Sequence, residues 1–127
     1  MKHTFCKEER LCSKVRIDEL FSDSPDKIKL TEFPFVLIAK KTKLNTNFPA
    51  QILFSVSKRK IKHAVKRNLI KRRCKEAYRQ HKNLLYSYLV AKNENLILSI
   101  VYIGNKPLPY QLIEEKIIVL LNRLTQE

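Results

Sequence analysis

The sequence predicts an α/β fold of the α+β type, a single two-layer domain with the element order αβββαβα around a mixed four-stranded sheet. Three observations lead to this prediction. β-rich runs alternate with segments of helical period, a strongly basic helix lies between two of the strands, and 127 residues suffice for one core. We therefore treat residues 1–127 as one domain.

The first element is expected to be a short helix over residues 14–21, with Ser13 placed to cap it. Its apolar side chains recur three and four residues apart, which puts them on one face: Ile17, Leu20 and Phe21. The turn-forming residues of 22–26 then end the helix.

Three β-rich segments follow, a short one at 28–30 and longer ones at 35–43 and 50–57. In the third segment apolar residues alternate with polar ones, which is typical of a strand with one buried face. A turn-rich stretch at 45–49 separates the last two segments, so we expect them to pair as an antiparallel hairpin.

The segment Lys58–Lys75 is the most distinctive part of the chain. It carries ten of the 26 Lys and Arg residues and no acid, which leaves sixteen basic and twelve acidic groups elsewhere, or +4 of the total +14. Its spacing is helical, with two rows on opposite faces. The row predicted to pack on the sheet is Ile70, Cys74, Ala77 and Tyr78, and the row predicted to face solvent is Asn68, Arg72, Lys75 and Arg79.

The apolar run at 96–103 fits a strand covered on both faces. A strand, the basic helix and this second strand together predict a βαβ unit. After a break at Gly104-Asn105 and two prolines, a final amphipathic helix is predicted from apolar residues at helical spacing: Tyr110, Ile113, Ile117, Leu120 or Leu121, and Leu124.

Composition restricts the class of function. A concentrated basic segment on a chain that can fold indicates a polyanionic partner. Nucleic acid is the first candidate, and an anionic membrane surface is the second. No apolar run approaches the roughly 20 residues that span a bilayer, and the first residues lack the apolar run of a secretory signal. The cysteines form no close pair, which favours free, inert thiols and a cytoplasmic location: Cys6, Cys12 and Cys74.

Signatures of a stand-alone enzyme are missing from the sequence. A single glycine excludes a glycine-rich phosphate loop, and the three histidines lack metal-ligand spacing: His3, His63 and His81. Adjacent acids do not face one another on a helix, so pairs such as Glu8-Glu9 and Glu114-Glu115 are interpreted as solvated or as charges at the start of a helix. We expect no metal site and no cofactor in the chain itself.

The kind of nucleic acid follows from where the basic helix lies. A helix flanked by strands is less suited to a DNA major groove than to the phosphates of folded RNA. Two roles stay open for Ile17 and Phe21. In the first role they line a groove in which unpaired bases stack, and in the second they simply pack in the core.

The segment Phe54–Arg79 (FSVSKRKIKHAVKRNLIKRRCKEAYR) resembles the signature of the protein subunit of bacterial ribonuclease P. The opening Lys7–Phe21 is also similar to the start of that family. The pattern departs at Leu69, where the family has a second Arg, so that contact is absent or supplied by a neighbour such as Arg73. The residues that match the signature are Ser55, Val56, Ser57, Lys58, Ala64, Val65, Arg67, Asn68, Ile70, Lys71, Arg72, Lys75, Glu76 and Tyr78.

The resemblance implies the family's fold, including a left-handed βαβ crossover, and its division of labour. In the family, a catalytic RNA subunit holds magnesium ions and removes the 5′ leader from precursor tRNA, while the protein binds that RNA and the single-stranded leader. The chain is therefore expected to be the non-catalytic protein subunit of a ribonucleoprotein endoribonuclease, bound 1:1 to its RNA. The alternatives are a structural RNA-binding protein of the ribosome and a stand-alone nuclease.

The resemblance also implies which residues bind. The leader cleft is expected at Phe21 and at Ile17 and Ile38, two positions where relatives often have aromatic residues. No catalytic residue is expected in the chain. RNA binding is expected at the basic turn and helix: Lys58, Arg59, Lys60, Arg67, Asn68, Lys71, Arg72, Arg73, Lys75 and Arg79.

Overall fold

Helices cover both faces of a single sheet. The structure, a computed structural model, describes residues 5, 7–22, 25–44 and 47–126. The predicted element order is confirmed, with a short 3₁₀ turn (η1) and one further helix (α3) added. The elements are η1 Lys7–Glu9, α1 Lys14–Phe21, β1 Ile28–Glu32, β2 Phe35–Lys41, β3 Ala50–Val56, α2 Ala64–His81, α3 Asn83–Lys92, β4 Leu96–Tyr102 and α4 Tyr110–Leu124.

The sheet is mixed, as predicted, with the strand order β1-β2-β4-β3. Strand β4 pairs antiparallel with β2 and parallel with β3. The predicted hairpin between 35–43 and 50–57 is therefore wrong, because β4 lies between those strands, and the hairpin is formed by β1 and β2 instead. Residues 96–100 are all buried, and a strand that is apolar on both faces gains most at the centre of a sheet.

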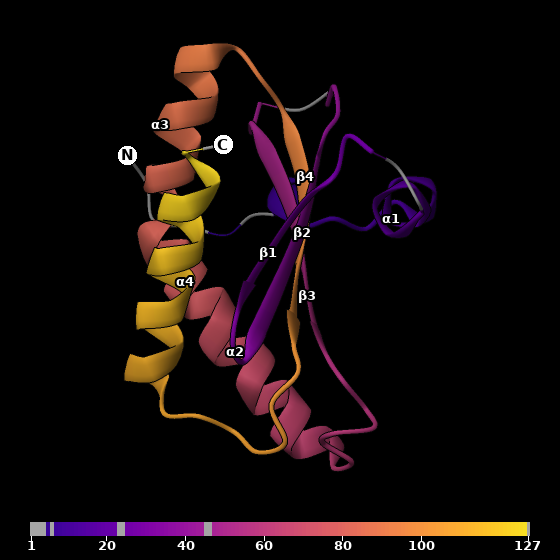
Figure 1. Cartoon of the computed structure of the whole chain (residues 1–127), viewed down its shortest axis with the longest axis vertical. Coiled ribbons are helices and arrows are strands. Elements are labelled where there is room, and N and C mark those ends of the chain that lie inside the picture. Colours follow the sequence, from indigo (N-terminus) through magenta and orange to yellow (C-terminus); the bar gives the residue numbers. More distant parts are fainter. Residues whose placement is uncertain (1–4, 6, 23–24, 45–46, 127) are drawn as a thin grey trace.

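The connection from β3 to β4 crosses over one face of the sheet. In Figure 1, β3 runs down behind β4, α2 and α3 return upward on the left, and β4 runs down in front of β3. This path makes a left-handed βαβ crossover, as the family resemblance implies, against the usual right-handed preference.

The main core lies between the sheet and the helices α2 and α4 (Figure 1). Leu37, Ile100 and Phe54 stand side by side across three strands and face these helices. Both predicted helix faces are confirmed by burial, although Tyr110 is only partly covered. The buried helix residues are Ile70, Cys74, Ala77 and Tyr78 on α2 and Ile113, Ile117, Leu120, Leu121 and Leu124 on α4.

A smaller apolar cluster lies on the opposite face, under α1. It consists of four buried residues, with three partly buried ones packed against them. Ser13 is the residue before α1, as predicted, but its side chain makes no capping hydrogen bond. The short helix is therefore held mainly by its apolar contacts with the sheet. The buried residues are Leu11, Leu20, Leu44 and Ile97, and the partly buried ones are Ile17, Ile38 and Leu53.

A buried ion pair ties the start of the chain to the junction of α2 and α3. The Nζ of Lys82 and the hydroxyl of Tyr86 both donate to Oε2 of Glu9, each at 2.5 Å. The Glu9 side chain is fully buried, so its interpretation as a solvated acid is wrong, whereas Glu8 is exposed. Buried charges in proteins are normally paired in this way, because removing an unpaired charge from water costs roughly several kcal/mol of folding free energy.

Within the described residues, no helix is long and apolar enough to cross a bilayer. The predictions that concern His3 and Cys6, and part of the predicted turns at 22–26 and 45–49, lie outside those residues.

Candidate RNA-binding surface

The basic turn between β3 and α2 projects its cations into solvent. Lys58, Arg59 and Lys60 are all exposed. The turn is closed by the amide of Ile61, which donates to the carbonyl of Ser57 at 3.0 Å, and the Ile61 side chain is buried. An apolar anchor thus holds a loop whose charged side chains point away from the core.

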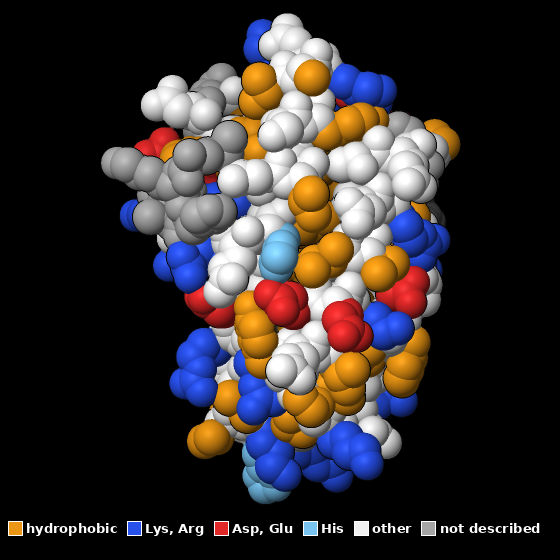
Figure 2. All heavy atoms as spheres, turned by 90° about the vertical axis from the view of Figure 1, so that its left-hand side faces the viewer, with side chains coloured by type: hydrophobic (Ala, Val, Ile, Leu, Met, Phe, Trp, Pro, Cys, Tyr) orange, Lys and Arg blue, Asp and Glu red, His pale blue; other side chains and the backbone are white. Residues whose placement is uncertain are grey.

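The predicted outer row of α2 is confirmed. Asn68, Arg72 and Lys75 are exposed, and Arg79 is half-buried. Lys71, half-buried on the same helix, adds another cation. Figure 2 shows Lys and Arg side chains gathered at the lower end of the molecule, where α2 begins. Such a concentration of cations is suited to phosphate groups.

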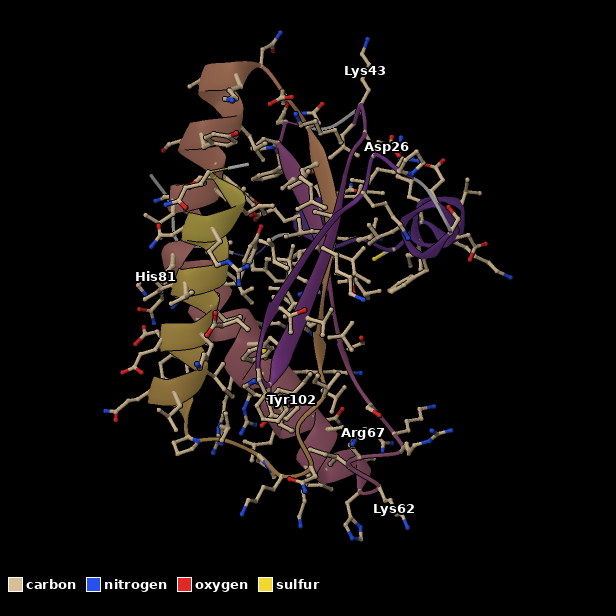
Figure 3. The ribbon with its side chains drawn as sticks, viewed as in Figure 1. Asp26, Lys43, Lys62, Arg67, His81 and Tyr102 are labelled. Atoms are coloured by element: carbon tan, nitrogen blue, oxygen red, sulfur yellow. The ribbon has the colours of Figure 1, made fainter. Side chains whose placement is uncertain are left out.

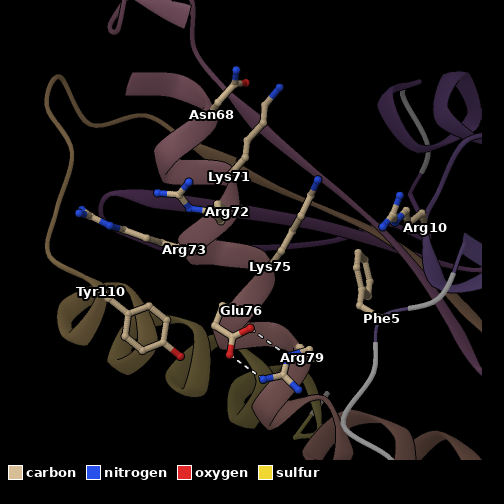
Figure 4. A pocket seen from close by; sticks show the side chains of 10 residues that line it. All are labelled: Phe5, Arg10, Asn68, Lys71, Arg72, Arg73, Lys75, Glu76, Arg79 and Tyr110. Carbon is tan, nitrogen blue, oxygen red and sulfur yellow. Dashed lines mark hydrogen bonds and ion pairs between the residues drawn. The ribbon is translucent and has the colours of Figure 1, made fainter. Parts of the chain in front are cut away.

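A hollow of about 700 Å³ lies along this basic helix (Figure 4). Sequence reasoning assigned no role there to Phe5 or Arg10, because the first residues show no periodic pattern. The structure brings Arg10 to the hollow through a backbone bridge between Arg10 and Ile52 of β3. The lining residues are Phe5, Arg10, Asn68, Lys71, Arg72, Arg73, Lys75, Glu76, Arg79 and Tyr110.

Three of the predicted RNA-binding arginines make hydrogen bonds within the chain. Arg67 donates to two backbone carbonyls just before α2, and Figure 3 shows it beside the turn that carries Lys62. Arg73 donates to the carbonyl of Leu108, and Arg79 donates to the carboxylate of Glu76. Arg73 lies one helical turn beyond Leu69, so the neighbour expected to replace the missing arginine already holds the loop before α4.

The carboxylates beside the basic surface are engaged. Hydrogen bonds from Arg79 and then Gln80 lower the pKa of Glu76 to about 2. On α4, Oε2 of Glu114 lies 2.9 Å from Nε2 of His81 and accepts a hydrogen bond from Tyr110. These acids therefore act as structural partners of α2 and α4.

The three predicted leader-cleft residues differ in how far they are exposed. Ile17 and Ile38 are partly buried and pack together with the cluster under α1. Phe21, the last residue of α1, keeps 49% of its surface exposed. Below this cluster, the open sheet face presents a row of partly exposed side chains that pair across β2, β4 and β3: Val36, Val101 and Ser55.

The described residues include two free cysteines and no candidate metal site. Cys12 is free and exposed, while Cys74 is free and buried, and burial raises the pKa of its thiol to about 12. No three His, Cys, Asp or Glu side chains of the described residues form a group that could hold a metal ion.

Comparison with known proteins decides the family. The family model described as Ribonuclease P matches residues 5–125, nearly the whole chain. The chain belongs to the ribonuclease P protein family. A ribonuclease P protein component of Chlorobium phaeobacteroides is 35% identical, over 58% of this chain and 56% of its own length. One of Blochmanniella floridana is 36% identical, over 68% of this chain and 71% of its own. The match with the Chlorobium protein thus spans little more than half of that relative.

Solved structures of ribonuclease P proteins share the fold. A Staphylococcus aureus RNase P protein superposes with a TM-score of 0.68 at 17% identity, covering 91% of this chain and 94% of that one. An RNase P protein from Thermotoga maritima, in complex with 1-(4-fluorophenyl)-2-thiourea, gives 0.64 at 18% identity, with 88% and 98% covered. The predicted α+β fold with a mixed four-stranded sheet is confirmed, and the ribosomal alternative finds no support among these matches.

Proposed function

We propose that this chain is the RNA-binding protein subunit of ribonuclease P, which assists a catalytic RNA in removing the 5′ leader from precursor tRNA. The family membership supports this role. The observation that carries it is the basic surface formed by an exposed turn and the exposed row of α2 that follows it, with a hollow of about 700 Å³ along the helix. Neutralising phosphates there releases counterions, which gives strong and salt-dependent affinity for RNA.

The chain itself is proposed to be non-catalytic, with magnesium held by the partner RNA. The carboxylates nearest the basic surface support this, because Glu76 and Glu114 are engaged by neighbouring side chains of α2 and α4. A metal-dependent nuclease would instead need carboxylates that converge on a cation. We further propose a 1:1 complex with the RNA, located in the cytoplasm.

The 5′ leader is proposed to lie on the sheet face beside α1. Phe21 is exposed at the end of that helix, and the open row of Val36, Val101 and Ser55 offers an uncharged floor. Ile17 and Ile38 would border the leader from the cluster under α1, so their contribution is to shape the groove. Their aliphatic side chains lack the flat faces on which bases stack.

Reconstitution tests the proposal. The purified chain alone is expected to leave precursor tRNA intact, and a transcribed bacterial ribonuclease P RNA is expected to cleave it at low magnesium only when the chain is added. The matched control is the same mixture with the turn and helix cations replaced, which should not restore cleavage. Metal-dependent cleavage by the chain without RNA would falsify the division of labour.

A further inference from the structure

Arg67 points back from the first turn of α2 toward the loop that precedes the helix. Its Nη1 donates to the carbonyl oxygens of Ile61, at 2.9 Å, and Lys62, at 2.7 Å. Figure 3 shows Arg67 lying next to this loop. These carbonyls come directly after the three exposed cations of the basic turn, so the guanidinium ties the exit of that turn to the helix.

The entrance of the turn is fixed by Ser57. Its amide donates to the carbonyl of Tyr102, at 3.2 Å, and its carbonyl accepts the amide of Ile61, at 3.0 Å. The Ser57 hydroxyl accepts the amide of Lys60, at 3.4 Å. With Ile61 buried to 3% exposure, the turn is held at the strand end by backbone bonds and at the helix end by Arg67.

This double attachment matters because the turn carries like charges. Lys58, Arg59 and Lys60 repel one another, which favours open conformations of the loop. Ordering a loop costs conformational entropy, so a turn that is ordered before binding avoids that loss when RNA is bound. A guanidinium is suited to the task because its planar fork donates to two acceptors at once and stays charged.

We propose that Arg67 is a positioning residue for RNA binding. It holds Lys58, Arg59 and Lys60 in the arrangement that RNA recognises, so its loss removes the contribution of the whole turn. The inference rests on the proposed function, and it goes beyond the family resemblance, which gives Arg67 only a direct contact with RNA.

A double-mutant cycle separates the two roles. The variants are Arg67→Gln, the turn triple variant (K58Q, R59Q, K60Q) and the two combined, and the measurement is the affinity for a transcribed bacterial ribonuclease P RNA at several salt concentrations. Each phosphate contact contributes about 0.7–0.9 to the salt slope. A positioning role predicts that Arg67→Gln lowers the slope by about two in the wild-type background and by less than about 0.5 in the triple variant, because coupled residues are non-additive.

A direct phosphate contact by Arg67 predicts a loss of about one unit in both backgrounds, and that result would overturn the inference. The matched control is Arg72→Gln, because Arg72 is exposed five residues further along the same helix. Its loss should be about one unit in both backgrounds. The same background dependence for Arg72 would also overturn the inference, because it would make the coupling a general property of the cations.

A second measurement uses the full chain without RNA. Amide hydrogen exchange at Ile61 should be at least about tenfold faster in Arg67→Gln and unchanged in Arg72→Gln, because the turn opens locally when it loses its attachment. Arg67→Lys keeps the charge and loses the planar fork, so it should also speed this exchange. Unchanged exchange in both Arg67 variants would refute the positioning role.

These two measurements also separate this inference from the function on which it rests. If the wild-type chain shows no salt-dependent binding to ribonuclease P RNA, the proposed function fails. The exchange experiment would still decide whether Arg67 orders the turn. Far-UV circular dichroism of each variant confirms that the fold is retained, and an Arg67→Gln variant that does not fold is replaced by Arg67→Lys in both measurements.

Discussion

The buried pair of Glu9 and Lys82 gives the most direct test of the structure. Glu9→Gln removes the negative charge that pairs with the Nζ of Lys82, whose side chain is 3% exposed. Oε2 of Glu9 accepts two hydrogen bonds at 2.5 Å, from Lys82 and from Tyr86, so the substitution weakens both. Breaking one side of a buried ion pair costs about 3–5 kcal/mol. We expect about 3 kcal/mol, because the amide oxygen of Gln still accepts one bond.

Urea unfolding followed by circular dichroism measures this loss. With an m-value of about 2 kcal/mol/M, a loss of about 3 kcal/mol moves the midpoint down by about 1.5 M. Glu8→Gln is the matched control, because Glu8 is adjacent and exposed, and its effect should stay below about 0.5 kcal/mol.

The double variant of Glu9→Gln and Lys82→Met completes the test. It removes both charges, so it should be clearly more stable than Glu9→Gln alone, since a buried pair replaced by apolar or neutral groups is often nearly neutral. Equal effects of Glu9→Gln and Glu8→Gln would refute the burial of this pair and, with it, the docking of η1 at the junction of α2 and α3.

Three further predictions concern the surface. Replacing Lys71 and Arg72 together by Ala should lower the salt slope of RNA binding by up to about two units, one per phosphate contact, and an unchanged slope would place both side chains away from the RNA. Phe21→Ala should weaken the binding of precursor tRNA more than that of mature tRNA, and equal losses would remove Phe21 from the leader site. The pKa of Glu76 is lowered to about 2 from 4.5 by Arg79, so their pairing stabilises the fold above about pH 4.5 and is lost as the pH falls toward 2. Because the pair is partly exposed, at 34% for Arg79 and 42% for Glu76, Glu76→Gln should cost less than about 1 kcal/mol at pH 7 and clearly less at pH 2, as measured by urea unfolding at both pH values.

Periodicity predicted the elements that carry the basic surface. The inner and outer rows of α2 follow directly from helical spacing, since Ile70 and Tyr78 are buried while Arg72 and Lys75 are exposed. The position of the basic residues after a strand also predicted that turn and helix form one surface. These are local features, and local spacing determines them.

The spacing of residues in the sequence could not predict which strands pair or which single charged residues are buried. The strands β2 and β3 are close in sequence, but β4 separates them, and alternation within a strand does not reveal its neighbour. Glu9 stands beside Glu8 in the same short turn, yet only Glu9 meets a buried lysine, 73 residues away. The contacts of Arg67 and Arg73 with backbone carbonyls could not be predicted either, because residue type and spacing do not distinguish these arginines from others on the same basic helix.

The place of β4 in the sheet has a consequence for synthesis on the ribosome. The central strand is made after the basic turn and α2, so these cations are synthesised before the surface on which α2 packs is complete. At about 5–20 residues per second, roughly 1–5 s pass between residue 75 and residue 102. At the entrance of the basic turn, the amide of Ser57 donates to the carbonyl of Tyr102, the last residue of β4, so translation must pass residue 102 before the turn can take the arrangement seen in the structure.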